Sequence, residues 1–166
     1  MKKELSLLIP NKKEVFLYLR YCLFFGFFIL KSCDKNRIYN EFDSDVEDNR
    51  WISNKAKVFS FSMATDEVVN LKLHLGHIYD FQFDSIPLQI VITYPDGHTE
   101  VIPLDVRIKN ESGQDIADCS GDICDLYYTF KNKVSLKKGE YSISITNTFS
   151  GAFLPNILGI GIQVEK

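Results

Sequence analysis

A strict alternation of apolar and polar side chains runs through most of the chain after Trp51, and it is the feature that most constrains the fold. The stretch "KVFSFSM" places Phe59, Phe61 and Met63 on one face and small polar residues on the other. Successive side chains of a strand point to opposite faces, so a period of two predicts half-buried strands, whereas a helix shows a period of 3.6. No segment after Trp51 has a helical period long enough to predict an α-helix instead of a strand.

About eight such segments follow one another, separated by turn signals such as Pro95-Asp96-Gly97 and Lys137-Lys138-Gly139. Proline presets φ and glycine accepts a positive φ, which favours tight turns at these places. Many short strands at this spacing are typical of a sandwich or a barrel. The sequence therefore predicts an all-β domain over residues 51–166, an antiparallel two-sheet β-sandwich with a jelly-roll-like order.

The first 32 residues differ from this domain. Five basic residues precede a ten-residue apolar run, Tyr21 to Leu30, and Arg20 interrupts any longer stretch. A membrane-spanning helix needs about 20 apolar residues, whereas a basic start and a short apolar core are typical of a secretory signal peptide. We interpret residues 1–32 as a lipoprotein signal peptide. An uncleaved membrane anchor is the main alternative, and a buried core helix is a third.

The boundary Leu30-Lys31-Ser32-Cys33 resembles the lipobox of bacterial lipoproteins, although Lys31 departs from its usual small or apolar residue. That resemblance implies cleavage before Cys33 and lipidation of its sulfur. Residues 33–50 would then be the lipidated cysteine and a flexible polar tether, because their composition cannot bury enough apolar surface to order itself. Ile38, Tyr39 and Phe42 are apolar exceptions in this segment that could dock on the domain, and Trp51 is expected to be the first packed residue.

The remaining cysteines, Cys119 and Cys124, form a pair in "DCSGDICD". Once the signal-peptide and lipobox cysteines are set aside, an even number of cysteines remains, and in an exported chain this predicts one disulfide. A redox or metal site is the alternative, but the loop itself supplies no histidine and no second cysteine pair. The chain carries 22 Asp and Glu against 19 Lys and Arg, and without the first 32 residues 20 acidic residues remain against 13 basic ones. An acidic domain without a basic stripe argues against nucleic-acid binding.

No catalytic constellation stands out, and we expect a non-enzymatic protein without metal or cofactor. His74, His77 and His98 are interpreted as surface histidines, because no further ligand is spaced to complete a site. The acidic residues around the cysteines favour a solvated loop over a calcium site. The dense aromatic residues are expected to be mostly core; they are Tyr79, Phe81, Phe83, Tyr94, Tyr127, Tyr128 and Phe130.

Several weak motifs in a fixed order resemble the gliding motility lipoprotein GldH family of Bacteroidota. They are Cys33, Tyr39, Phe42, Trp51, Phe59-x-Phe61, Asp66, Asn70-Leu71, Phe81-x-Phe83, Tyr94-Pro95-Asp96-Gly97, Gly139-x-Tyr141 and Gly159-Ile160-Gly161-Ile162. Gly76-His77 and the segment after Gly113 depart from the family's pattern. The resemblance implies an outer-membrane lipoprotein that supports gliding, anchored at Cys33, with protein partners in the gliding or type IX secretion apparatus. A surface carbohydrate-binding lipoprotein is the alternative, since fold alone does not decide function.

Overall fold

The computed structural model describes residues 36–166, which form one compact unit. The predicted signal peptide, residues 1–32, and Cys33 lie outside the described residues. Between residues 36 and 166, the structure contains no helix that is long and apolar enough to cross a membrane.

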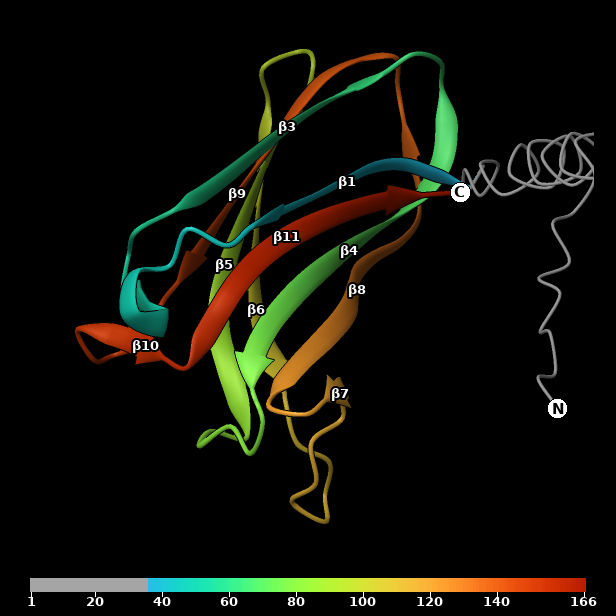
Figure 1. Ribbon diagram of the computed structural model, residues 1–166. Helices are drawn as coiled ribbons and strands as arrows, with labels where there is room; N and C mark the ends of the chain where they lie inside the picture. The colour runs from blue at the N-terminus through green and yellow to red at the C-terminus, as the bar shows by residue number, and fades with distance from the viewer. Residues whose placement is uncertain (1–35) are drawn as a thin grey trace, which may run out of the picture. The chain divides into compact units, whose positions relative to one another are not determined.

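The elements form two layers of antiparallel strands (Figure 1). The five-stranded sheet has the order β1 (Arg37–Asp43), β11 (Ile157–Glu165), β4 (Glu67–Ile78), β8 (Ile123–Leu136), β7 (Asp118–Ser120). The four-stranded sheet has the order β3 (Lys57–Met63), β9 (Gly139–Asn147), β5 (Ser85–Thr93), β6 (Thr99–Arg107). A short ribbon pairs β10 (Phe153–Pro155) with β2 (Arg50–Ile52), next to the 3₁₀ turn η1 (Glu47–Asn49).

The connectivity is that of a jelly roll. Without the short strands β2, β7 and β10, eight long strands remain, four in each sheet. The chain crosses between the sheets at almost every connection, and β5–β6 is the only long hairpin that stays within one sheet. Two four-stranded antiparallel sheets wound in this way define the jelly-roll architecture. The predicted all-β fold, its two sheets and its jelly-roll order are confirmed.

The core lies between the two sheets, and the alternation of the sequence fills it. Strand β3 follows the predicted pattern, with Phe59, Phe61 and Met63 buried and the serines between them exposed. Strands β4, β5, β9 and β11 contribute their inward faces in the same way. Burial of this apolar surface is the main stabilising contribution. The apolar residues that are fully buried include Leu71, Leu73, Leu75, Ile86, Ile90, Ile143, Ile145, Ile157 and Ile162.

The segment expected to be a flexible tether is different in the structure. Residues 37–43 form β1, which pairs with β11 along its whole length, and Ile38 and Tyr39 pack against the core. The prediction that Trp51 is the first packed residue is therefore wrong. The edge of β11 supplies the hydrogen-bond partners for the backbone of this polar segment. The composition of the segment itself contains no information about such a partner strand. The folded unit begins at Asn36.

Candidate functional site

A row of three rings crosses the outer face of the five-stranded sheet. In the strand register Phe42 of β1 lies opposite Gly161 of β11, Gly161 lies opposite His74 of β4, and His74 lies opposite Tyr127 of β8. The ring of Phe42 tilts against His74 with centroids 4.4 Å apart, and His74 stacks on Tyr127 at 4.3 Å. We call Phe42, His74 and Tyr127 the aromatic row.

Glycines make the row possible. A Cβ at Gly161 would lie 3.0 Å from the Cα of Phe42 and still closer to the carbonyl oxygen of Glu41. A Cβ at Gly159 would lie 2.7 Å from the carbonyl oxygen of Asp43 and would also meet the Phe42 ring. Real Cβ atoms do not approach backbone oxygens so closely, so only glycine lets β1 and the Phe42 ring lie flat on β11.

Polar side chains border the aromatic row and complete an open groove of about 620 Å³. Two residues further along each strand, on the same face, Asn40, Gln163 and Lys72 lie side by side on three adjacent strands. Lys72 forms an ion pair with Glu165 at the same end. The groove is lined by Arg37, Asn40, Phe42, Lys72, His74, Asp125, Tyr127, Gln163 and Glu165.

The groove presents exposed rings and hydrogen-bonding groups to solvent. Tyr127 is 50% exposed and Phe42 37%, so their rings present apolar area to a partner. Partial burial, followed by the charge of Asp125, raises the pKa of Tyr127, and its phenol therefore stays protonated and can donate a hydrogen bond. Nε2 of His74 lies 2.6 Å from Oδ1 of Asp125, which fixes the imidazole. Within residues 36–166 the histidines hydrogen bond to carboxylate or carbonyl oxygens, namely those of Asp125, Ile78 and Asp96.

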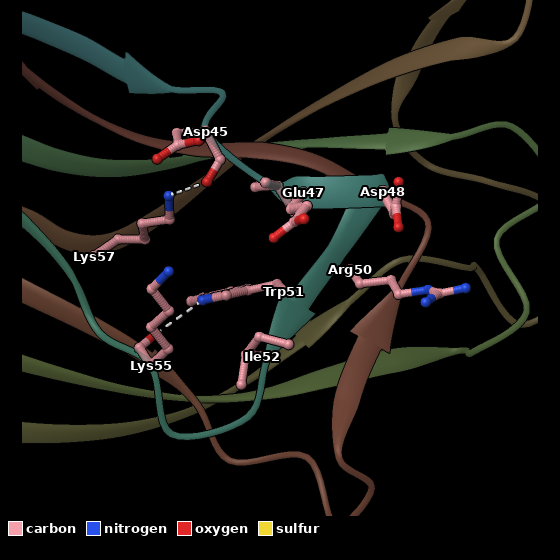
Figure 2. A pocket seen from close by; sticks show the side chains of 9 residues that line it. Asp45, Glu47, Asp48, Arg50, Trp51, Ile52, Lys55 and Lys57 are labelled. Atoms are coloured by element: carbon pink, nitrogen blue, oxygen red, sulfur yellow. Dashed lines mark hydrogen bonds between the residues drawn. The ribbon is translucent and has the colours of Figure 1, made fainter.

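A second hollow, of about 250 Å³, lies beside Trp51 (Figure 2). Its wall contains Lys57, which is only 8% exposed, and whose ammonium group forms an ion pair with Asp43 at 2.8 Å and donates to the carbonyl of Asp45 at 2.6 Å. The indole N–H of Trp51 donates to the carbonyl of Lys55. These polar groups already have partners inside the protein, and they hold the turn between β1 and β2 in place.

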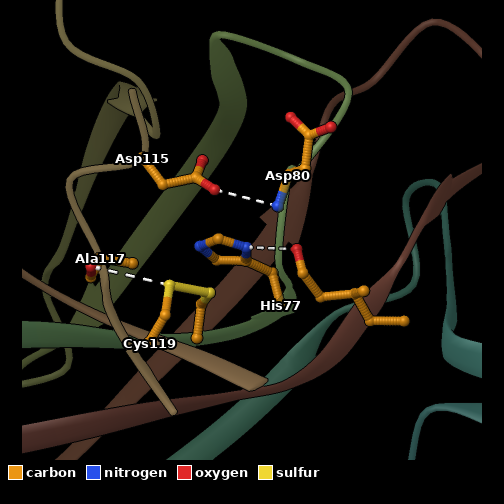
Figure 3. The surroundings of a disulfide bond; sticks show 7 residues. His77, Asp80, Asp115, Ala117 and Cys119 are labelled. Atoms are coloured by element: carbon orange, nitrogen blue, oxygen red, sulfur yellow. Dashed lines mark hydrogen bonds between the residues drawn. A yellow bond between two sulfur atoms is a disulfide. The ribbon is translucent and has the colours of Figure 1, made fainter. Parts of the chain in front are cut away.

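The predicted disulfide pair lies at the β7 edge of the five-stranded sheet. Cys119 of β7 and Cys124 of β8 are cross-strand neighbours, and the structure joins them by a sulfur–sulfur bond (Figure 3). Strand β7 itself was not predicted; it exists because the chain turns back on β8 at Gly121, which has a φ of +63°.

The histidines have three different environments. His98 is exposed and His74 belongs to the aromatic row, whereas His77 is fully buried next to Phe81. The interpretation of His77 as a surface histidine is therefore wrong. Strand β4 is long enough to carry both histidines, and their odd sequence offset, from i to i+3, places His74 on its outer face and His77 on its inner face.

Most of the aromatic residues pack in or against the core, as predicted, but Tyr79 and Tyr127 are exposed. Alternation could have found Tyr127, because Cys124, Leu126 and Tyr128 share the inner face of β8 and leave Tyr127 outside. Of the acidic residues around the cysteines, Asp118 and Asp122 are exposed and Asp125 binds His74.

The fold is that of an all-β sandwich protein with an open groove on its five-stranded sheet. More particularly, the chain belongs to the GldH lipoprotein family, whose model matches residues 37–164. It is 25% identical over 146 residues to the gliding motility lipoprotein GldH of Flavobacterium johnsoniae, covering 83% of this chain and 90% of that protein. It is 23% identical over 155 residues to a GldH homolog of Christiangramia forsetii, covering 88% and 94%.

Among solved structures, one similar chain is described as CBM35 from Cellvibrio japonicus Abf62. The two are 12% identical, with a TM-score of 0.35 over 75% of this chain and 92% of that one.

Proposed function

We propose that this protein is an outer-membrane lipoprotein that supports gliding motility as a non-enzymatic interaction subunit of the envelope machinery. The match to the GldH lipoprotein family over residues 37–164 is the observation that carries this proposal. The names of both curated relatives support the same role. The anchor in this proposal is the lipid on Cys33.

The structure supports a short connection to that lipid. Strand β1 begins at Arg37, so the chain from Cys33 to Arg37 can span at most about 14 Å, at 3.3–3.6 Å per residue. A domain held so near the membrane meets membrane-bound partners at a high effective concentration, and a small interface is then sufficient. Exposed aromatic rings are the side chains that most often anchor such interfaces. We therefore assign the partner surface to the aromatic row and its polar border.

Deletion of the gene in the bacterium that carries it tests this function. We expect the loss of single-cell gliding and of colony spreading, with both restored by the wild-type gene. The matched control is a complementing gene with Val101→Ala, which changes an exposed apolar side chain on the outer face of the four-stranded sheet. Unaffected gliding in the deletion strain would refute the proposed role.

A second candidate function, binding of a neutral oligosaccharide on the cell surface, is supported by one observation. The exposed Tyr127 ring lies next to amide and charged groups in an open groove, and this combination suits the apolar face and hydroxyls of a sugar. Calorimetric titration with cell-surface oligosaccharides separates the two functions. Saturable binding that Tyr127→Ala abolishes supports the sugar site, whereas no binding together with a loss of gliding in the same variant supports a protein partner.

A further inference from the structure

The disulfide has two unusual neighbours among the residues that the structure describes. His77 lies directly opposite Cys124 in the β4–β8 ladder, and Cys124 lies opposite Cys119, so the three side chains share one row on the inner face of the sheet. Asp115 approaches the same place from the loop before β7 (Figure 3). One carboxylate oxygen of Asp115 and the two sulfurs lie within 4.8 Å of one another.

His77 has the hydrogen-bonding arrangement of a metal ligand. Its Nδ1 lies 3.0 Å from the carbonyl oxygen of Ile78, and because a carbonyl can only accept, Nδ1 carries the proton. Nε2 is then the lone-pair nitrogen, and within the described residues it is buried without a hydrogen-bond partner. A metal-binding histidine typically donates its other N–H to a backbone carbonyl, which fixes the tautomer and the ring.

Asp115 resembles His77 in having one side-chain atom with a hydrogen-bond partner and one buried acceptor without a partner. Its Oδ2 accepts a hydrogen bond from the backbone N–H of Asp80 at 3.0 Å, while Oδ1 is buried and has no partner among residues 36–166. Burying a polar atom without a partner is unfavourable, because its hydrogen bonds to water are lost. Two such acceptors, His77 Nε2 and Asp115 Oδ1, border one disulfide, and both have lone pairs for a cation.

We propose that His77, Asp115, Cys119 and Cys124 form a redox-gated zinc site. In the oxidised protein the site is closed, since disulfide sulfurs are neutral and the thiolate is the ligand. A cellular dithiol transfers two electrons and two protons to the disulfide, becomes a disulfide itself, and leaves two cysteine thiols. Zinc then displaces the two thiol protons and binds both sulfurs.

The ligand set suits zinc in number and kind. Zinc takes four ligands in tetrahedral sites and accepts thiolate, imidazole and carboxylate together. Nε2 of His77 lies outside the set of three atoms within 4.8 Å, so the proposed site requires the imidazole to move closer once the sulfur–sulfur bond is open. Access is one-sided, because Cys119 is partly exposed and Cys124 is buried, and a reductant therefore attacks the sulfur of Cys119.

The sequence did not predict this site because its ligands come from different elements. The loop between the cysteines holds no histidine, and His77 stands more than forty positions before Cys124. Only the pairing of β4 with β8 brings them together.

The full chain, purified in detergent, tests the proposal by zinc titration with and without a thiol-free reductant. We expect about one zinc ion for each reduced chain and none for the oxidised chain, measured by metal analysis after desalting. The double variant Cys119→Ser/Cys124→Ser should lose the zinc. His77→Gln and Asp115→Asn should each weaken zinc affinity more than about tenfold, whereas Asp122→Asn, an exposed acid of the same loop, should not.

Cobalt gives an independent readout, since a thiolate-to-cobalt charge-transfer band appears only if sulfur binds the metal. Melting of each oxidised variant shows whether it folds before any metal is added. If the reduced chain unfolds and zinc restores its fold, the site is supported. Absence of zinc binding by the reduced chain, unfolding that zinc does not reverse, or equal binding by the double serine variant would each overturn the proposal.

Discussion

The ring of Phe42 reaches across a neighbouring strand to contact the imidazole of His74, with centroids 4.4 Å apart. The two residues stand on β1 and β4, and β11 runs between them with glycine at the point of crossing. This contact has two consequences. It packs β1 against the five-stranded sheet. It also makes the rings of Phe42, His74 and Tyr127 one continuous surface, because His74 stacks on Tyr127.

Gly161→Ala is expected to destabilise the fold by about 1–3 kcal/mol, because the new methyl group would collide with the backbone of β1 at Glu41 and Phe42. Urea unfolding followed by the fluorescence of Trp51, the single tryptophan, measures the change. Ser62→Ala, an exposed position on β3, is the control and should leave the midpoint in place. Equal midpoints for Gly161→Ala and wild type would show that β1 does not need this close approach.

Tyr127→Ala is expected to abolish gliding while changing the free energy of unfolding by no more than about 1 kcal/mol, since the side chain is half exposed and its ring contact is the stacking on His74. Single-cell tracking and immunoblotting of the complemented deletion strain measure motility and protein level. Val101→Ala, equally exposed on the opposite sheet, should glide normally. Normal gliding with Tyr127→Ala would rule out the aromatic row as the partner surface.

The ion pair between Asp43 and Lys57 is expected to make stability depend on pH. Burial by itself raises the pKa of Asp43, but the hydrogen bonds from Lys57 and from the backbone of Asp45, with the lysine charges, outweigh it and leave the pKa below its usual value. A carboxyl whose pKa is lower in the folded state stabilises the fold above its unfolded pKa, near 3.9, and this contribution disappears as the pH falls through the folded value.

Asp43→Asn should therefore cost about 1–3 kcal/mol at neutral pH, and the difference from wild type should shrink below about pH 4. Unfolding curves of both proteins between neutral pH and pH 3 measure this. Asp105→Asn, an exposed acid on β6, is the matched control. A difference that stays constant down to the lowest pH would show that the charge of Asp43 does not contribute.

Cys33→Ala is expected to abolish incorporation of labelled palmitate and to move the protein from the membrane fraction to the soluble fraction. Several acyl chains hold a protein firmly, at about 0.8 kcal/mol for each buried CH₂, and the variant has no sulfur to carry them. Cys119→Ser/Cys124→Ser should retain the label. A Cys33→Ala protein that stays in the membrane would favour an uncleaved anchor.

The sequence by itself determined the fold class, because alternation is a local property. Phe59, Phe61 and Met63 point inward whatever strand lies next to them, and the same holds for the inner faces of β4, β9 and β11. Turn residues at Gly97 and Gly139, both with positive φ, mark where strands end for equally local reasons. These signals predicted the sandwich and its core without any knowledge of which strands pair.

Only the tertiary structure decided which residues meet. Phe42, Gly161, His74 and Tyr127 form one row, although they come from four strands spread along almost the whole chain. The ordering of residues 37–43 and the burial of His77 beside Cys124 have the same origin. Pairing between distant strands depends on register and on the free backbone groups of the partner strand. Neither can be predicted from the local alternation of a single strand.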